Sequence, residues 1–90
     1  MPTFDELHDA VTRANDVEFG LHGAVFTENL HDAFYVAEHL EVGAVIVNDS
    51  TDYRLDTMPF GGVKKSGVGR EGIRFAAEEM TVTRVVCLNL

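Results

Sequence analysis

Few residues in this chain have the types and spacing that catalysis requires. Cys87 is the only thiol, and no histidine or lysine lies near it in the sequence to convert it to a thiolate. Neither a His-x-x-x-His nor a Cys-x-x-Cys spacing occurs, so no metal site is expected. Asp49, Asp52 and Asp56 crowd one polar stretch, where a general acid/base pair is conceivable but solvent-facing carboxylates are favoured. We therefore expect no catalytic residue and no metal ligand.

Arg54 is the side chain best suited to bind a charged ligand. A guanidinium group presents paired N–H donors that match a carboxylate or a phosphate. An ion pair of Arg54 with Asp52 or Asp56 is the structural alternative, since these carboxylates lie two residues away on either side. The sequence leaves both explanations open.

The segment Pro59–Gly72 concentrates glycine and positive charge. It contains five of the chain's eight glycines, and four of the seven basic residues lie in or beside it. Glycine at this density predicts positive φ angles or a close approach of other groups. Core-like sequence on both sides favours an ordered loop over a flexible linker. Gly67–Gly72 fits G-x-G-x-x-G, but no strand precedes it and no P-loop glycine precedes Lys65-Ser66, so neither phosphate-binding motif is predicted.

Four segments, in this order and at this spacing, resemble motifs of the aldehyde dehydrogenases. Pro59–Gly72 is similar to the family's hallmark Pro-Phe-Gly-Gly-x-Lys-x-Ser-Gly-x-Gly-Arg-Glu-Gly. Asn15–Leu21, Gly23–Thr27 and Val45–Asn48 resemble the Ala-Asn-x-x-x-Tyr-Gly-Leu segment, the Gly-Val-Phe-Thr strand and a strand that ends in Asn. The resemblance identifies the chain as the C-terminal part of such an enzyme. Residues 49–59 are most similar to the lactaldehyde and non-phosphorylating glyceraldehyde-3-phosphate branch.

The resemblance implies an oxidoreductase chemistry to which this chain contributes only a part. In the intact family a cysteine attacks the aldehyde, hydride passes to NAD or NADP, and a glutamate-activated water releases the carboxylic acid. The nucleophile segment, the glutamate segment and the cofactor domain are all absent from these residues. Cys87 does not follow the Gly-Gln-x-Cys pattern of the family nucleophile. We therefore expect the chain by itself to bind no cofactor and to be inactive.

The same resemblance implies where a substrate would meet this chain. Asn48–Met58 would line the mouth of the substrate tunnel, with Arg54 selecting the tail of the aldehyde. Phe60 would border the tunnel, although composition alone favours a core aromatic at this position. Many relatives carry an acid that could pair with Arg70 at the position of Val82, so the role of Arg70 is open.

Composition limits the partners and the location. The net charge of −8 disfavours nucleic acid and anionic membrane as partners. One cysteine excludes an internal disulfide and fits a reducing, cytoplasmic environment. No stretch approaches the length of a membrane span, and no signal segment is expected at the N-terminus. A chain of 90 residues forms at most one domain.

Hydrophobic periodicity predicts an α/β fold around a parallel βαβ unit. Gly23–Thr27 and Ala44–Val47 read as strands, and the second lacks alternation, which is typical of a strand covered on both faces. A helix that begins at Thr27 or Asn29 connects them, with Gly43 as a left-handed cap after it. A strand–helix–strand connection this short predicts parallel pairing.

Further elements flank this unit. A capping box of Thr3 and Glu6 predicts a first helix, whose apolar face comprises Leu7, Ala10, Val11 and Ala14. The polar stretch before Pro59 has no helical period and is expected to be a loop. A third helix is predicted from Arg70 to Met80, followed by a strand at Thr81–Leu90.

The resemblance divides the chain into residues 1–80, the C-terminal portion of a catalytic domain, and residues 81–90, a terminal oligomerisation strand. It implies that the chain contributes to the tunnel mouth and to a subunit interface, with a homo-oligomer formed through Thr81–Leu90. The alternative is a stand-alone interaction module or truncated gene product that docks on full-length subunits. A fragment without function is a third possibility.

Overall fold

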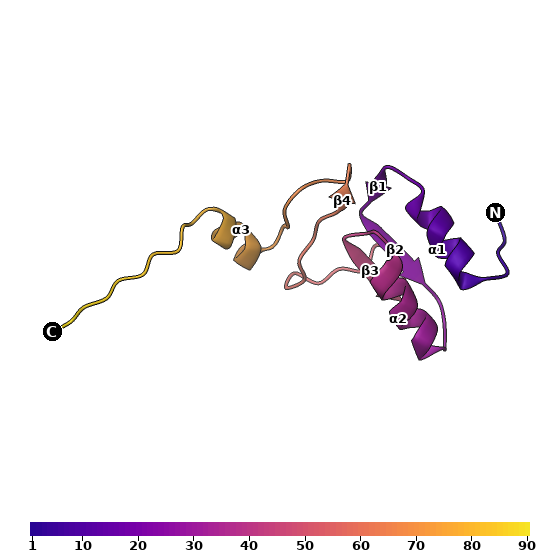
Figure 1. Cartoon of the computed structure of the whole chain (residues 1–90), viewed down its shortest axis with the longest axis horizontal. Coiled ribbons are helices and arrows are strands. Elements are labelled where there is room, and N and C mark those ends of the chain that lie inside the picture. Colours follow the sequence, from indigo (N-terminus) through magenta and orange to yellow (C-terminus); the bar gives the residue numbers. More distant parts are fainter.

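The computed structural model describes all 90 residues and contains three helices and four short strands. Figure 1 shows the helices α1 and α2 and the strands gathered at one end, with α3 and the C-terminal residues projecting away from them. None of the helices has the length and apolar sequence that a bilayer span requires. In chain order the elements are α1 (Leu7–Asn15), β1 (Phe19–Gly20), β2 (His22–Val25), α2 (Leu30–His39), β3 (Ala44–Val47), β4 (Val63–Lys64) and α3 (Ile73–Glu79).

The predicted parallel pair is confirmed. β2 and β3 are parallel, with His22 opposite Ala44 and Val25 opposite Val47, and α2 connects them. α2 begins after Asn29, whose side chain accepts a hydrogen bond of 2.9 Å from the main-chain N–H of His31. An asparagine at this position satisfies a donor that the first turn of a helix leaves free.

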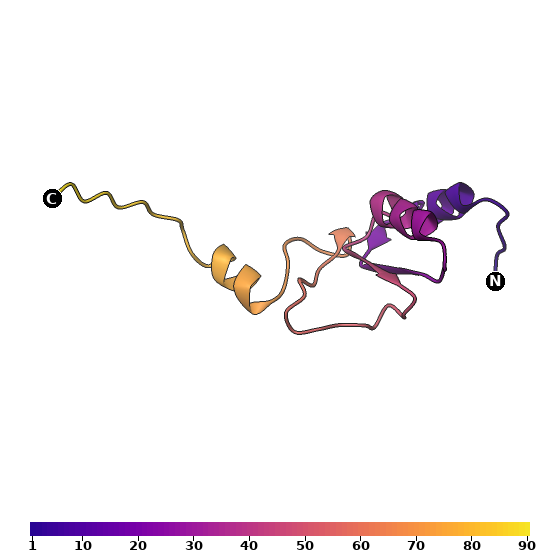
Figure 2. The same cartoon turned by 90° about the horizontal axis from the view of Figure 1, so that it is seen from below.

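One face of the β2–β3 pair is covered by both helices (Figure 2). Their apolar side chains meet in a small core, in which Val11, Val36 and Ile46 are buried. No second layer covers the other face, and Val47 is 42% exposed. The prediction that Ala44–Val47 is covered on both faces is therefore wrong for this chain, because only one layer of helices is present.

A second, antiparallel pair was not predicted. β1 pairs with β4, so that Phe19 lies opposite Lys64 and Gly20 opposite Val63. The sequence gives no sign of β4, because two residues are too few for an alternating pattern and their partner lies far away in the chain. This pair places the glycine-rich segment against the chain that follows α1.

Two predicted caps are wrong. The N-cap of α1 is Glu6 and makes no side-chain hydrogen bond, while the carbonyl of Thr3 accepts a bond of 3.4 Å from Arg13 Nη1. The C-cap of α2 is Leu40, and Gly43 is not among the glycines with positive φ. Gly43 is needed for a different reason, because a Cβ at this position would overlap the carbonyl oxygen of Gly61.

The strand predicted at Thr81–Leu90 is not formed within the single chain, where these residues are neither helix nor strand. A strand requires a partner for its main-chain groups, and the extended end of the chain lies apart from both sheets (Figure 1). α3 is shorter than predicted, and its Ile73 and the following Met80 are 89% and 85% exposed.

The chain as a whole is more extended than a folded monomer of its size. Its accessible surface is 7595 Å², against roughly 5,200 Å² for a compact protein of this mass. Its radius of gyration is 17.7 Å, where about 12 Å is typical of a compact domain of this length. The apolar side chains of α3 and the C-terminal residues account for much of the uncovered surface.

Gly43→Ala should lower the free energy of unfolding by about 1–3 kcal/mol, because the added methyl group meets a main-chain carbonyl that cannot rotate away. Gly23→Ala is the matched control, since its Cβ would overlap only the flexible side chain of Leu40 and would meet Val42 at an ordinary contact distance. Urea unfolding followed by far-ultraviolet circular dichroism measures both. Equal losses for the two variants would contradict the close approach at Gly43.

Candidate functional site

The structure brings together the two residues predicted to bind substrate. The guanidinium carbon of Arg54 lies 4.2 Å from the centre of the Phe60 ring, within the range of a cation–π contact. The acidic partner of Arg54 is Glu71, at 3.7 Å between Nη2 and Oε2. The alternative ion pair with Asp52 or Asp56 is therefore not formed.

The ion pair between Arg54 and Glu71 leaves the guanidinium group accessible. The two side chains are 49% and 72% exposed, and the separation is long for a charge-assisted hydrogen bond. A pair of this kind contributes at most about 1 kcal/mol. An incoming anion can therefore compete with Glu71 for the N–H groups of Arg54.

Phe60 is held by its main chain and by its ring. It forms a β-bridge with Glu71, with N–H to carbonyl distances of 3.0 and 2.6 Å. Its half-buried ring meets the imidazole of His22 edge-on, with centroids 5.1 Å apart and an interplanar angle of 80°. Phe60 is therefore not a fully buried core residue, and one contact of its ring is with the cation of Arg54.

Asn48–Met58 is a loop, as predicted, and begins with a firmly held residue. Asn48 has a φ of 59°, and its side-chain amide pairs with the main chain of Thr27 at 2.8 and 2.9 Å. A cavity of about 420 Å³ lies at the carboxyl end of β3; its lining residues are Val45, Ile46, Val47, Asn48, Asp49, Tyr53 and Met58. The predicted tunnel-mouth stretch thus does border a cavity, although Arg54 and Phe60 lie outside it.

The carboxylates of this loop do not form an acid/base pair. Asp49 accepts a hydrogen bond of 2.8 Å from the N–H of Ser50, and Asp52 accepts one from the Ser50 hydroxyl group. Both carboxylates are exposed. They serve to shape the turn that precedes Arg54.

The glycine-rich segment is an ordered loop with the predicted positive φ angles. Gly67, Gly69 and Gly72 have φ values of 142°, 72° and 131°. Arg70 Nη1 donates to the carbonyls of Gly62, at 3.1 Å, and Gly69, at 2.7 Å. Arg70 therefore has a structural role that needs no acidic partner, and its main-chain partners could not be found from the sequence.

Lys64 joins this loop to the end of α1. Its Nζ donates to the carbonyls of Asn15 and Val17 at 2.7 and 3.2 Å and pairs with Glu41 at 2.6 Å. The Oγ of Ser66 accepts a bond of 2.8 Å from the N–H of Gly20. Sequence reasoning missed both residues; the only local signal was a lysine and a serine among glycines.

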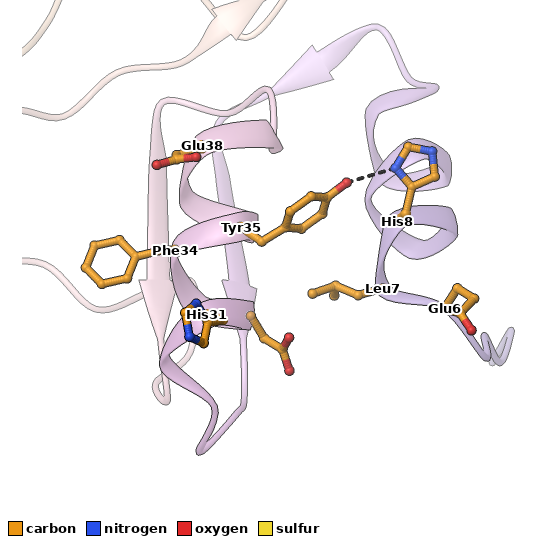
Figure 3. A pocket seen from close by; sticks show the side chains of 8 residues that line it. Glu6, Leu7, His8, His31, Phe34, Tyr35 and Glu38 are labelled. Atoms are coloured by element: carbon orange, nitrogen blue, oxygen red, sulfur yellow. Dashed lines mark hydrogen bonds between the residues drawn. The ribbon is translucent and has the colours of Figure 1, made fainter.

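The remaining candidates lie away from this cluster. Cys87 is exposed in the C-terminal stretch, and no three His, Cys, Asp or Glu residues lie together as a metal site would require. A second cavity, of about 550 Å³, lies between α1 and α2. There the hydroxyl group of Tyr35 on α2 points toward His8 on α1, 2.8 Å from its Nδ1, while Phe34 points away (Figure 3).

Arg70→Met should speed amide hydrogen exchange in residues 60–72 at least tenfold, because two charge-assisted hydrogen bonds are lost, each contributing about 1.5–3 kcal/mol. Arg74→Met is the matched control, since Arg74 is 81% exposed and pairs only with Glu78. Exchange followed by mass spectrometry locates the change. Similar profiles for both variants would show that Arg70 does not hold this loop.

Comparison with known proteins agrees with the motifs. The family model described as "Aldehyde dehydrogenase family" matches residues 1–86. The 3-sulfolactaldehyde dehydrogenase of Priestia megaterium is 48% identical over 87 residues, which are 97% of this chain and 18% of that protein. The lactaldehyde dehydrogenase of Methanocaldococcus jannaschii is 50% identical over 76 residues, which are 84% of this chain and 16% of that protein.

A solved structure shows the same fold. It is the structure of the glyceraldehyde-3-phosphate dehydrogenase GapN of Methanocaldococcus jannaschii, complexed with NADP, and it superposes with a TM-score of 0.78. The match has 52% sequence identity and covers 81% of this chain and 16% of the GapN chain. The chain therefore spans less than a fifth of the length of these relatives. Its motifs, its fold and these matches lead to one conclusion: the chain belongs to the aldehyde dehydrogenase family.

Proposed function

We propose that this chain forms the substrate-tunnel mouth and part of a subunit interface in an NAD(P)-dependent aldehyde dehydrogenase that oxidises an aldehyde with an anionic tail. The observation that carries the proposal is the accessible guanidinium group of Arg54 over the Phe60 ring. The catalytic cysteine, the glutamate and the cofactor site belong to the rest of the enzyme. The 90 residues by themselves are then inactive and bind no cofactor.

Arg54 is suited to bind the tail of the substrate. Contact with the ring restrains the guanidinium group, while its N–H groups lie at the edge of the guanidinium plane. Glu71 balances the charge when no anion is present, but its long and exposed ion pair is readily exchanged. A sulfonate, phosphate or carboxylate offers the same two-oxygen geometry at shorter distance.

The names of the relatives support an anionic tail. The substrate in one name, 3-sulfolactaldehyde, carries a sulfonate, and glyceraldehyde 3-phosphate carries a phosphate. Lactaldehyde is the neutral counterpart. A single arginine at the tunnel mouth is a simple means of distinguishing these substrates, and this is the role we give to Arg54.

The interface proposal concerns residues 81–90. Their apolar side chains are strongly exposed, with Val82 at 93% and Leu88 at 78%. Extended chain with free N–H and C=O groups pairs with a strand of another chain where one is offered. We therefore place these residues in the C-terminal part of the enzyme as a strand that forms in a homo-oligomer. A stand-alone interaction module is not favoured, since the family match extends through nearly the whole chain.

The proposed location of the enzyme rests on its cysteine content. A single, exposed cysteine and no disulfide are compatible with a reducing compartment, and we place the enzyme in the cytoplasm.

Arg54→Ala should reduce kcat/KM for an anionic aldehyde about ten- to hundredfold, because one charge-assisted hydrogen bond contributes about 1.5–3 kcal/mol. The test uses a chimera in which this chain replaces the matching 87 residues of the Priestia megaterium enzyme. 3-Sulfolactaldehyde and lactaldehyde differ only by the sulfonate, so lactaldehyde should be affected less than threefold.

Arg74→Ala in the same chimera is the control, because Arg74 lies on α3 and pairs only with Glu78. It should leave the preference between the two substrates unchanged. If Arg54→Ala lowers kcat/KM equally for both aldehydes, Arg54 does not bind the tail.

The 90-residue chain should form dimers or larger species at micromolar concentration, as measured by size-exclusion chromatography with light scattering. Val86→Pro should shift the population toward monomer, because proline removes an N–H that strand pairing requires. Val86→Thr keeps that N–H group and a β-branched side chain and should leave the distribution unchanged. A monodisperse, cooperatively folding monomer of the intact chain would contradict the interface proposal.

A further inference from the structure

His22 joins the two ends of the segment that carries Arg54. It is the first residue of β2, and its Nδ1 lies 2.9 Å from the carbonyl oxygen of Thr51. The edge-on contact with Phe60 is made by the same imidazole ring. Thr51 and Phe60 flank Arg54 in the sequence on either side, so one side chain restrains both flanks of the arginine.

The hydrogen bond to Thr51 fixes which nitrogen of the His22 imidazole carries a hydrogen. A carbonyl oxygen only accepts, so Nδ1 is the donor of this bond. The imidazole is thereby held on the main chain that precedes Arg54.

The contact between His22 and Phe60 also restrains the guanidinium group of Arg54, which lies over the Phe60 ring. The Phe60 ring lies 4.2 Å from the guanidinium carbon of Arg54, and its orientation decides which face meets the cation. We infer that His22 is a positioning residue for Arg54, and that it aligns the guanidinium group for an anionic tail through Thr51 and Phe60. The effect on substrate choice rests on the proposed function of Arg54, whereas the effect on the segment does not.

His22→Ala in the chimera should raise KM for 3-sulfolactaldehyde about five- to tenfold, since one neutral hydrogen bond and one aromatic contact are lost. kcat, and the KM for lactaldehyde, should change less than twofold. His22→Asn should recover part of the loss, because its amide can donate to the Thr51 carbonyl. His31→Ala, on the exposed side of α2, is the control and should change neither constant.

The coupling between the two residues separates positioning from a general loss of structure. In an Arg54→Ala background, His22→Ala should have no further effect on KM for 3-sulfolactaldehyde. If the two substitutions raise KM for 3-sulfolactaldehyde by factors that multiply in the double variant, the inference is overturned, because His22 then acts without Arg54. An equal rise in KM for both aldehydes, with Arg54→Ala still selective, would overturn it as well.

Trypsin supplies a readout that does not depend on activity. His22→Ala should accelerate trypsin cleavage after Arg54 at least fivefold relative to cleavage after Arg74. His22→Asn should accelerate cleavage after Arg54 to a smaller extent. Unchanged cleavage after Arg54 would overturn the inference. If cleavage accelerates but Arg54→Ala shows no preference between the aldehydes, His22 still positions Arg54, and it is the proposed substrate class that fails.

Discussion

The two main-chain hydrogen bonds between Phe60 and Glu71 close the glycine-rich segment into a loop, and the arrangement of the site depends on this closure. They place the carboxylate of Glu71 beside Arg54 and the ring of Phe60 beneath its guanidinium group. Arg70 stabilises the same loop through the carbonyls of Gly62 and Gly69. Closure requires positive φ angles at Gly67, Gly69 and Gly72, which glycine adopts without strain, and Lys64 in the same segment has a positive φ of 54°.

The rest of the chain holds this loop in place by long-range polar contacts rather than by a large core. Only three apolar side chains are buried, and none of them completely, so packing alone supplies little stability. Lys64 instead ties the loop to the carbonyls at the end of α1, and Ser66 ties it to β1. The Asn48 amide fixes the start of the neighbouring loop on Thr27. Together these bonds bring Arg54 and Phe60 to one surface.

Local patterns were sufficient to predict the βαβ unit and the loop that follows it. The apolar run of β3 and the asparagine before α2 are signals contained within a few residues, and both proved correct. The cap at Thr3 was wrong because such a pattern states only a local preference, which the rest of the chain must support. The strand at Thr81–Leu90 is not formed within the single chain, because a strand needs a partner for its main chain and these residues pair with neither sheet.

The members of the candidate site were predicted singly, but their contacts were not. Arg54 and Phe60 were chosen for different reasons, and no pattern in the sequence implied that one lies over the other. Glu71 was overlooked as the partner of Arg54 because nearer carboxylates were available, and His22 because nothing local connects it to Phe60. Such contacts depend on how the loop closes, which only the folded chain determines.

The most direct test of the central claim is a crystal structure of the chimeric enzyme with 3-sulfolactate bound. We expect two sulfonate oxygens within about 3.2 Å of the Arg54 guanidinium nitrogens, with the group still stacked on Phe60 and displaced from Glu71. A sulfonate bound elsewhere in the tunnel, with Arg54 still paired to Glu71, would contradict the account.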